Sequence, residues 1–244
     1  MKVLITGGAG FIGSHLCEEL LARNCTVKVL DDLSTGNMSN LEIPKAMSRF
    51  EFVHGSILDV PTLENSVQGV DCIYHMAAAV GVKYVLDNPV NSLIINSKGT
   101  ENVLNAAVKG GGVKVVLASS SEVYGKSTSI PFKETDNIVM GSTSVSRWGY
   151  ACAKALDEFL ALAYNQEGLV PIVGVRLFNT VGPRQQGRYG MVMPRFIRQA
   201  LKNEDITVYG DGEQRRSFTY VKDVVKALSD IKDNWKAHGE IFNI

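Results

Sequence analysis

A tyrosine and a lysine four positions apart are the first pair in this sequence that could carry acid–base chemistry. Of the eight tyrosines, only Tyr150 is followed by a lysine at the fourth position, Lys154. On a helix these two side chains lie on the same face. An ammonium near a phenol favours the phenolate and lowers a pKa that starts at about 10. Such a tyrosine can take a proton from a hydroxyl group as hydride leaves the same carbon, although the spacing alone is common on amphipathic helices.

A second candidate stretch, 117-LASSSEVYG-125, lies at the end of an apolar run. Ser120 is the central residue of the serine run, and Glu122 follows two positions later. A carboxylate costs free energy where strand ends pack into a cleft. Glu122 is therefore either a solvated loop residue or a catalytic group, and its neighbours decide between the two.

Three glycines near the N-terminus are spaced like a phosphate-binding turn. Gly7, Gly10 and Gly13 lie between an expected first strand and an expected first helix. Glycine permits a tight turn and a close approach of backbone to pyrophosphate, and the helix N-terminus supplies oriented N–H groups. Asp31, at the end of the second expected strand, can accept both hydroxyls of an adenosine ribose and would repel a 2′-phosphate. The pattern indicates a dinucleotide site that favours NAD over NADP.

Short apolar runs alternate with longer helical patterns along the chain. The expected strands are residues 2–6, 26–30, 50–54, 71–75, 113–119 and 169–177. The expected helices lie near residues 11–23, 60–68, 88–109, 146–166 and 191–202. This alternation predicts an α/β fold, a Rossmann-like doubly wound parallel sheet covered on both faces. We expect residues 1–177 to form the NAD-binding domain, and residues 178–244 to form a small, incomplete substrate lobe with segments that return to the sheet.

The composition fits a folded cytoplasmic protein. Apolar residues make up 45% of the 244 residues, and 25 basic residues balance 25 acidic ones, so no overall positive field would attract nucleic acid. The four cysteines are widely spaced, which indicates reduced thiols. The sequence shows no signal peptide, membrane-spanning run or cluster of metal ligands. Because the last residues, 240-EIFNI-244, read as a strand without a polar tail, we expect a truncated chain.

Several motifs together resemble the extended short-chain dehydrogenases/reductases that modify nucleotide-diphospho-sugars. They run through the whole chain: TGGAGFIGSHL, DDLSTG, HMAA, ASSSEVYG, YACAK, RLFNTVGPR and GDGEQRRSFTYVKD. The resemblance implies NAD as the cofactor, a nucleotide-diphospho-sugar as the substrate, and a homodimer formed through the helices near 88–109 and 146–166. Family members are usually longer, so part of the substrate lobe would be absent here.

The resemblance also implies which residues hold the cofactor. Phe11 and Ile12 would lend backbone N–H groups to the pyrophosphate, and Asn96 matches the asparagine beneath the active-site loop. Ser56 stands where the family often has an aspartate for the adenine amine, so that contact is expected to be weak or absent. The implied cofactor residues are Gly7, Gly10, Phe11, Ile12, Gly13, Asp31, Ser56, Ile57, Ala77, Ala78, Asn96, Tyr150 and Lys154.

The same resemblance implies the catalytic and substrate residues. Tyr150 would be the base, and Lys154 would hold the nicotinamide ribose and tune Tyr150. Ser120 would hydrogen-bond the reacting sugar oxygen. Asn179 and Arg216 would contact the diphosphate-sugar. The implied catalytic residues are Ser120, Glu122, Tyr150 and Lys154, and the implied substrate residues are Ser120, Asn179, Val192, Tyr209 and Arg216, with Tyr209 beside the nucleobase.

Glu122 separates reactions that share a first oxidation at C4 of the sugar. A C4 ketone makes a C6 carboxylate a β-keto acid, which loses carbon dioxide readily. A 4-epimerase commonly has a small neutral residue at this position, and a 4,6-dehydratase pairs such a glutamate with an adjacent acid, where this chain has Ser121. A decarboxylase needs no such acid, but the hydroxyl–Ser–Glu order, the stretch DNIVMG and the RWGYACAK context resemble UDP-glucuronate decarboxylases. We favour a UDP-glucuronate decarboxylase, then a UDP-glucose-type 4-epimerase, then a sugar 4,6-dehydratase. An NAD-sensing or scaffold protein is the non-enzyme alternative.

Overall fold

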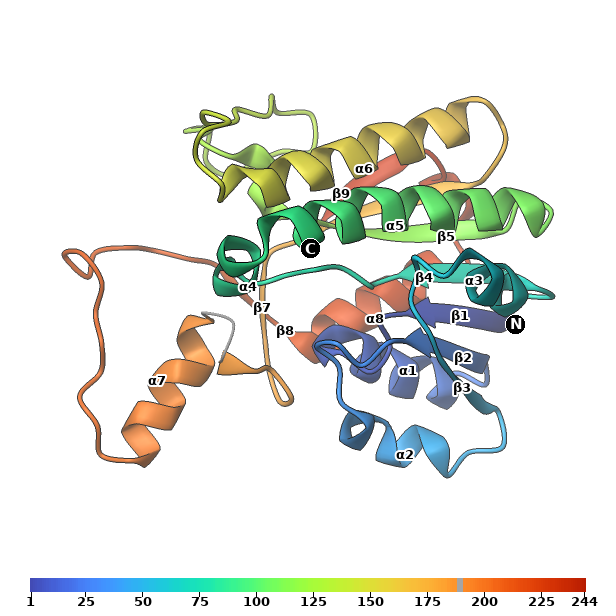
Figure 1. The fold of residues 1–244 in the computed structure, drawn as a ribbon, viewed down its shortest axis with the longest axis horizontal. Coiled ribbons are helices and arrows are strands. Elements are labelled where there is room, and N and C mark those ends of the chain that lie inside the picture. The colour runs from blue at the N-terminus through green and yellow to red at the C-terminus, as the bar shows by residue number, and fades with distance from the viewer. Residues whose placement is uncertain (188–190) are drawn as a thin grey trace.

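A seven-stranded parallel sheet forms the centre of the molecule (Figure 1). The computed structural model describes residues 1–187 and 191–244. The strand order is β3-β2-β1-β4-β5-β6-β9, so the direction of winding reverses between β1 and β4. The strands are β1 (Lys2–Thr6), β2 (Thr26–Asp31), β3 (Phe50–His54), β4 (Cys72–His75), β5 (Lys114–Ser120), β6 (Ile172–Leu177) and β9 (Glu240–Asn243). The predicted doubly wound α/β fold is confirmed.

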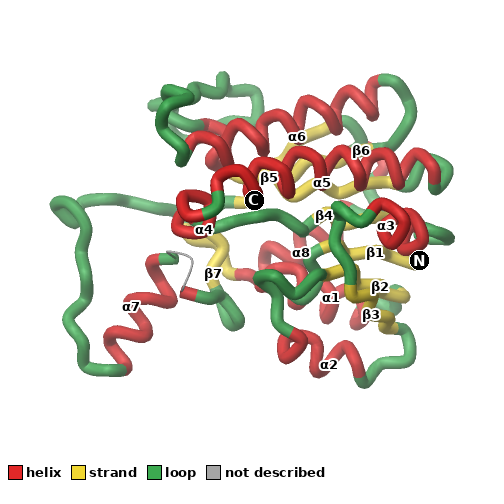
Figure 2. Tube along the Cα trace, in the orientation of Figure 1, coloured by secondary structure: helices red, strands yellow, loops and turns green. Residues whose placement is uncertain are grey.

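Helices cover both faces of this sheet (Figure 2). The helices on one face are α1 (Phe11–Ala22) and α8 (Val221–Ile231). The helices on the other face are α3 (Val60–Val67), α5 (Pro89–Lys109) and α6 (Trp148–Gln166). Two short helices, α2 (Glu42–Lys45) and α4 (Val82–Asp87), were not expected from the sequence.

The first strand shows why the apolar runs of the sequence are continuous. Val3 and Ile5 belong to the apolar core between the sheet and the α1–α8 layer, whereas Leu4 belongs to the core on the opposite face. All three are fully buried. Successive strand residues point to opposite faces, so a strand covered by helices on both sides is apolar at every position.

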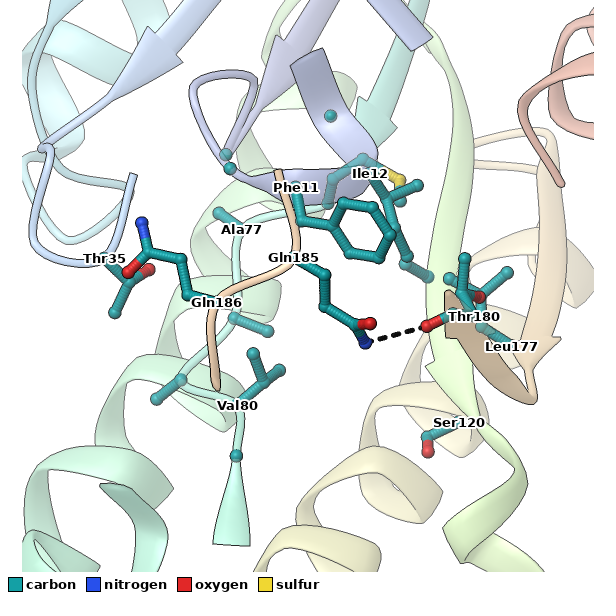
Figure 3. A pocket seen from close by; sticks show the side chains of 18 of the residues that line it. Phe11, Ile12, Thr35, Ala77, Val80, Ser120, Leu177, Thr180, Gln185 and Gln186 are labelled. Carbon is teal, nitrogen blue, oxygen red and sulfur yellow. Dashed lines mark hydrogen bonds between the residues drawn. The ribbon is translucent and has the colours of Figure 1, made fainter. Parts of the chain in front are cut away.

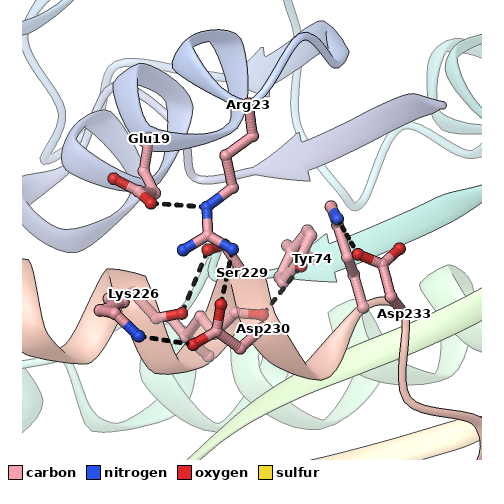
Figure 4. Close-up of polar contacts among 9 residues, drawn as sticks. Glu19, Arg23, Tyr74, Lys226, Ser229, Asp230 and Asp233 are labelled. Carbon is pink, nitrogen blue, oxygen red and sulfur yellow. Dashed lines mark hydrogen bonds and ion pairs between the residues drawn. The ribbon is translucent and has the colours of Figure 1, made fainter.

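Helices α1 and α8 are joined by ion pairs at the surface (Figure 4). Arg23 of α1 contacts Glu19 at 2.7 Å and Asp230 of α8 at 2.5 Å. Below them, the buried Tyr74 hydroxyl donates to the Leu228 carbonyl oxygen over 2.9 Å. These contacts fasten a late helix to the first βα unit, so the sheet layer is built from both ends of the chain.

The strand expected at 169–177 is shorter than predicted, because it begins at Ile172. The N–H groups of Leu169 and Val170 instead donate to the Tyr164 carbonyl at the end of α6. Those residues therefore close the helix before the chain enters the sheet. Such helix-closing bonds satisfy carbonyls that the last helical turn leaves open.

Residues between β6 and α8 form a separate, open segment at one end of the sheet (Figure 1). Strands β7 (Asn179–Val181) and β8 (Phe218–Tyr220) pair in parallel, and α7 (Val192–Leu201) lies apart from the main body. Residues 204–209 adopt no regular structure. In the part of the chain that is described, no helix has the length and apolar character needed to cross a membrane.

Candidate active site

A pocket of about 640 Å³ opens at the carboxyl ends of the central strands. Its lining comes from the glycine turn, the ends of β2, β4 and β5, helix α6 and the segment after β6. Figure 3 shows Phe11, Ala77 and Ser120 around this space, with Gln185 from the segment after β6. In doubly wound sheets, ligands bind where the strand order reverses, and this volume suits a dinucleotide or a nucleotide-sugar portion.

The glycine turn leaves no room for side chains. An added Cβ at Gly13 would lie 2.3 Å from the carbonyl oxygen of Gly7. Gly7 has a φ of +73°, and a Cβ there would lie 2.6 Å from the backbone nitrogen of Ala77. Because these positions have to be glycine, the backbone and the first N–H groups of α1 can approach a pyrophosphate directly. The residues present fit the phosphates of a dinucleotide.

Asp31 is held at the end of β2 by backbone hydrogen bonds. Its two carboxylate oxygens accept from Ala9 N–H at 2.9 Å and from Leu33 N–H at 2.8 Å. Burial raises the pKa of Asp31, and these two hydrogen bonds oppose that shift. The carboxylate lines the pocket with acceptor capacity to spare, which suits the two hydroxyls of a ribose.

The remaining residues predicted for the cofactor divide into two groups. Asn96 lies outside the lining and is buried, where its side chain accepts from Ala79 N–H and donates to the Ala79 carbonyl. It therefore shapes the loop after β4 that forms one wall. The predicted residues that line the pocket beside the glycines and Asp31 are Phe11, Ile12, Ser56, Ile57, Ala77, Ala78, Tyr150 and Lys154.

The four predicted catalytic residues all line the same pocket. Ser120 ends β5, and its hydroxyl accepts from the N–H of Glu122 at 3.2 Å, which starts the 3₁₀ turn Ser121–Tyr124. Tyr150 and Lys154 reach the pocket from the first turns of α6. The end of β5 with its following turn and the start of α6 thus bring two separate stretches of sequence to one site.

The pKa of Tyr150 is raised well above its usual range, which corrects the expectation that Lys154 would lower it. Burial is the largest cause, the negative charge of Glu122 adds to it, and the Ser120 hydroxyl opposes it through a hydrogen bond. The Lys154 ammonium lies 3.3 Å from Asp157, so a neighbouring carboxylate offsets its charge. Desolvation disfavours the phenolate more than this balanced pair favours it.

The Glu122 side chain is exposed, and it lines the pocket. Its side chain is accessible, yet the surrounding walls limit its hydration and raise its pKa, while Arg147 opposes that shift. A raised carboxyl pKa in a cleft is typical of a group that exchanges protons. Glu122 therefore lies in the pocket, and its catalytic role stays a prediction.

The predicted substrate residues are only partly gathered. Asn179, Val192 and Arg216 line the pocket. Tyr209 lies outside the lining, is exposed, and its hydroxyl accepts from Arg195 at 2.9 Å. The open segment therefore brings three of these side chains to the site and leaves the fourth on the surface.

The sequence reasoning missed Asp157 and the residues after β7. Asp157 follows Lys154 at i+3, a spacing that places both on one helix face and could have been recognised. Gln185 lines the pocket by donating to the Thr180 carbonyl at 2.9 Å, as Figure 3 shows. No local pattern marks Gln185, because its position depends on the turn after β7.

Comparison with known proteins identifies the family. The profile of the NAD dependent epimerase/dehydratase family matches residues 3–244. The chain therefore belongs to this NAD-dependent family.

Two proteins that are similar to this chain are named as decarboxylases. The UDP-N-acetyl-alpha-D-glucosaminuronate decarboxylase of Bacillus cytotoxicus is 46% identical over all of this chain and 74% of its own length. UDP-glucuronic acid decarboxylase 1 of Arabidopsis thaliana is 37% identical over 96% of this chain, which spans 52% of that protein. The chain thus spans about three quarters of one relative and about half of the other.

A solved structure shows the same fold with ligands. The UDP-glucuronic acid 4-epimerase of Bacillus cereus, in complex with UDP-glucuronic acid and NAD, aligns with a TM-score of 0.90 and 32% identity. The alignment covers all of this chain and 77% of the epimerase. Decarboxylases and epimerases are therefore both similar to this chain. The choice between the two reactions has to come from the residues in the pocket.

Proposed function

We propose that this protein oxidises a UDP-sugar acid at C4 with NAD and then releases the C6 carboxylate as carbon dioxide. The observation that carries the proposal is the placement of Glu122 in one pocket with Ser120 and Tyr150. A 4-epimerase needs only room for the keto sugar to turn before the hydride returns, and its residue at this position is commonly small and neutral. Similarity to two uronate decarboxylases supports the same choice.

In this proposal the glycine turn and Asp31 hold NAD, which supplies the hydride acceptor when bound. Gly7, Gly10 and Gly13 admit the pyrophosphate to the start of α1, and Phe11 and Ile12 offer N–H groups there. Ser56, Ile57, Ala77 and Ala78 line the walls. Asn96 acts at one remove, because its two hydrogen bonds fix the loop after β4.

The proton of the C4 hydroxyl goes to Tyr150. Ser120 holds that hydroxyl beside the phenol, since both side chains line the pocket and hydrogen-bond each other. Lys154 presents an ammonium to the same space, where it can bind ribose hydroxyls and stabilise the phenolate. A cationic nicotinamide bound beside Tyr150 would favour the phenolate and so lower this raised pKa.

Glu122 acts after the sugar carries a ketone at C4. The bond between C5 and the carboxylate carbon would break, carbon dioxide would leave, and the electron pair would enter an enolate on the C4 oxygen. Protonation of that enolate at C5 would give a 4-keto pentose, and the hydride taken from C4 would stay with the cofactor or return to C4. Tyr150, now protonated, can stabilise the C4 oxygen, and Glu122 on the neighbouring turn orients the departing carboxylate.

The open segment contributes contacts to the nucleotide-sugar. Asn179 lines the pocket from β7, and Arg216 lines it from the residues just before β8. Val192 lines it from α7. A guanidinium such as that of Arg216 suits a diphosphate. Tyr209 would reach a nucleobase only if the segment 204–217 moved towards the pocket.

A 4-epimerase is the second candidate. The solved epimerase bound to UDP-glucuronic acid and NAD shows that this fold can hold an acidic sugar. In that case Glu122 would bind near the sugar without taking part in bond breaking. The two functions differ in their product, so product analysis separates them.

We also propose a homodimer formed through α5 and α6. These adjacent helices expose a row of large apolar side chains to solvent: Val90, Leu93, Ile94, Leu156 and Phe159. Phe159 is 67% exposed, and exposed patches of this kind mark protein interfaces. Phe159→Glu should convert a dimer to a monomer in light scattering, whereas a wild-type monomer would contradict the proposal.

The four free cysteines support a reducing, cytoplasmic location, which cell fractionation tests.

Incubation with UDP-glucuronate, UDP-N-acetylglucosaminuronate and UDP-glucose tests the main proposal. We expect carbon dioxide and a UDP-sugar shortened by one carboxylate from at least one acid, and no product from Tyr150→Phe. A 4-epimer without carbon dioxide would establish the second candidate instead. NAD binding without any product from these sugars would favour the sensing or scaffold alternative.

A further inference from the structure

Two neighbouring acids on α6 are both buried, and they differ in how they are satisfied. Glu158 accepts hydrogen bonds on both oxygens, from Arg176 at 3.0 and 2.8 Å and from Ser119 at 2.5 Å. Asp157 forms one ion pair, with the Lys154 ammonium at 3.3 Å through Oδ2, and the Thr100 hydroxyl lies close to its carboxylate. Its other oxygen, Oδ1, is buried without a hydrogen-bond partner. The first acid is part of a closed network, and the second is not.

The Asp157–Lys154 pair is almost completely removed from solvent. The side chains are 1% and 3% exposed. Burying an ion pair costs desolvation that its attraction often fails to repay, and a carboxylate oxygen without a hydrogen-bond partner adds to that cost. Stability therefore does not account for Asp157, whereas it does account for Glu158.

Asp157 lies where its charge is felt at the reactive groups. It is one of two acids that raise the pKa of Tyr150, the other being Glu122 on the turn after β5. Burial raises the pKa of Asp157 itself, the Lys154 ammonium opposes that shift, and Glu158 adds to it. The Thr100 hydroxyl of α5 lies near the carboxylate but donates to the Asn96 carbonyl.

The opposite side of Lys154 carries no second anion. His75 at the end of β4 is fully buried, and desolvation together with the Lys154 charge lowers its pKa to about 3, so its ring is neutral. That ring is held between Thr6 at 2.8 Å and Thr100 at 3.1 Å. Asp157 is thus the sole carboxylate that contacts the ammonium among the residues described.

We propose that Asp157 is a positioning residue that anchors the Lys154 ammonium one helical turn beyond Tyr150 and partly offsets its charge there. The ion pair then fixes the position of the Lys154 ammonium, so that it can bind the cofactor ribose without first being ordered. Its field at Tyr150 is weaker than that of a lone ammonium, so the phenol keeps its proton at neutral pH until cofactor and substrate are both bound. This inference rests on the proposed roles of Tyr150 and Lys154.

Two substitutions separate the anchoring from the charge. Asp157→Asn keeps an oxygen that accepts from the ammonium and removes the negative charge. Asp157→Leu removes both the charge and the acceptor while keeping the same branching of the side chain. Asp230→Asn is the matched control, because Asp230 also pairs with cations but lies on the surface between α1 and α8. Thermal unfolding of each variant shows whether the fold is retained.

The first readout is the pH dependence of NADH formation in a single turnover with the sugar acid. Tyr150 acts as a base when deprotonated, so a lower pKa moves the midpoint to lower pH. We expect the midpoint to fall by about one pH unit in Asp157→Asn and to stay unchanged in Asp230→Asn. An unchanged or higher midpoint in Asp157→Asn, with the fold intact, would overturn the charge role.

The second readout is the NAD dissociation constant, which needs no turnover. Asp157→Leu should weaken NAD about tenfold, and Asp157→Asn should weaken it far less, because the amide oxygen still holds the ammonium. Equal affinities in all variants would overturn the anchoring role. If Tyr150→Phe turned over normally, the proposed function would fail, and NAD affinity would still decide whether Asp157 anchors Lys154.

Discussion

The glycine-turn half of the site and the segment between β7 and β8 differ in burial and in regular secondary structure. The first lies on strands whose residues are fully buried, and its glycines and Asp31 are fixed by backbone contacts of about 3 Å. The second exposes large apolar residues such as Leu201, which is 81% accessible, and carries Arg216 on a stretch without regular structure.

In the proposed function, NAD would meet a preformed site, and the nucleotide-sugar would meet a segment that has little regular secondary structure. Preorganised groups bind without a cost for ordering them, whereas mobile side chains lose conformational freedom on binding. Cofactor affinity should therefore depend steeply on single atoms. Substrate affinity should depend on many small contacts.

Loss of the Tyr150 hydroxyl should have the largest effect on chemistry. Tyr150→Phe removes the proton acceptor and little volume, so NADH formation should fall about a thousandfold while NAD affinity and unfolding temperature hold. Tyr164→Phe is the control, because that hydroxyl lies on the same helix but donates to Asn105 at the surface. Near-normal turnover by Tyr150→Phe would require another base.

The packing contrast can be measured with two leucines. Leu228→Ala on α8 empties a fully buried position and should lower the free energy of unfolding by about 2–4 kcal/mol. Leu201→Ala on the exposed end of α7 should change it by less than about 0.5 kcal/mol. Comparable losses in chemical denaturation would show that the open segment is as tightly packed as the sheet.

A single methyl group should disturb the glycine turn. In Gly13→Ala the added carbon would lie 2.3 Å from the Gly7 carbonyl, so the turn has to shift, at a cost of about 1–3 kcal/mol. We expect NAD to bind roughly tenfold or more weakly in calorimetry. Gly149→Ala meets its nearest side-chain atom at 3.5 Å and should bind NAD as the wild type does.

Asp31 should set the choice of cofactor by a smaller margin. Asp31→Ala removes the carboxylate that repels a 2′-phosphate, so the preference for NAD over NADP should narrow about tenfold. Part of the change should be weaker NAD binding, because the ribose loses its acceptor. Equal affinity of the unaltered protein for both cofactors would contradict the assignment.

The sequence predicted the sheet and most of the site because both depend on local patterns. Strand ends, the glycine spacing and the Tyr150–Lys154 pair each lie within a few residues, and the parallel sheet brings strand ends to one edge. The open segment followed no such rule, since the position of Tyr209 depends on contacts such as that with Arg195. The raised pKa of Tyr150 was also beyond reach, because burial and the Asp157 contact exist only in the fold.

If Glu122 serves a step that follows oxidation at C4, the Glu122→Gln variant should separate that oxidation from the later step. The variant should be mixed with NAD and UDP-glucuronate or UDP-N-acetylglucosaminuronate, with NADH absorbance and carbon dioxide followed together. The predicted result is a trapped NADH signal without carbon dioxide, because the amide keeps the size of the side chain but loses the carboxylate. Since Glu122 raises the pKa of Tyr150, NADH should also form at lower pH in the variant than in the wild type. Carbon dioxide release at the wild-type rate, or unchanged 4-epimerisation with no carbon dioxide from either protein, would contradict the claim.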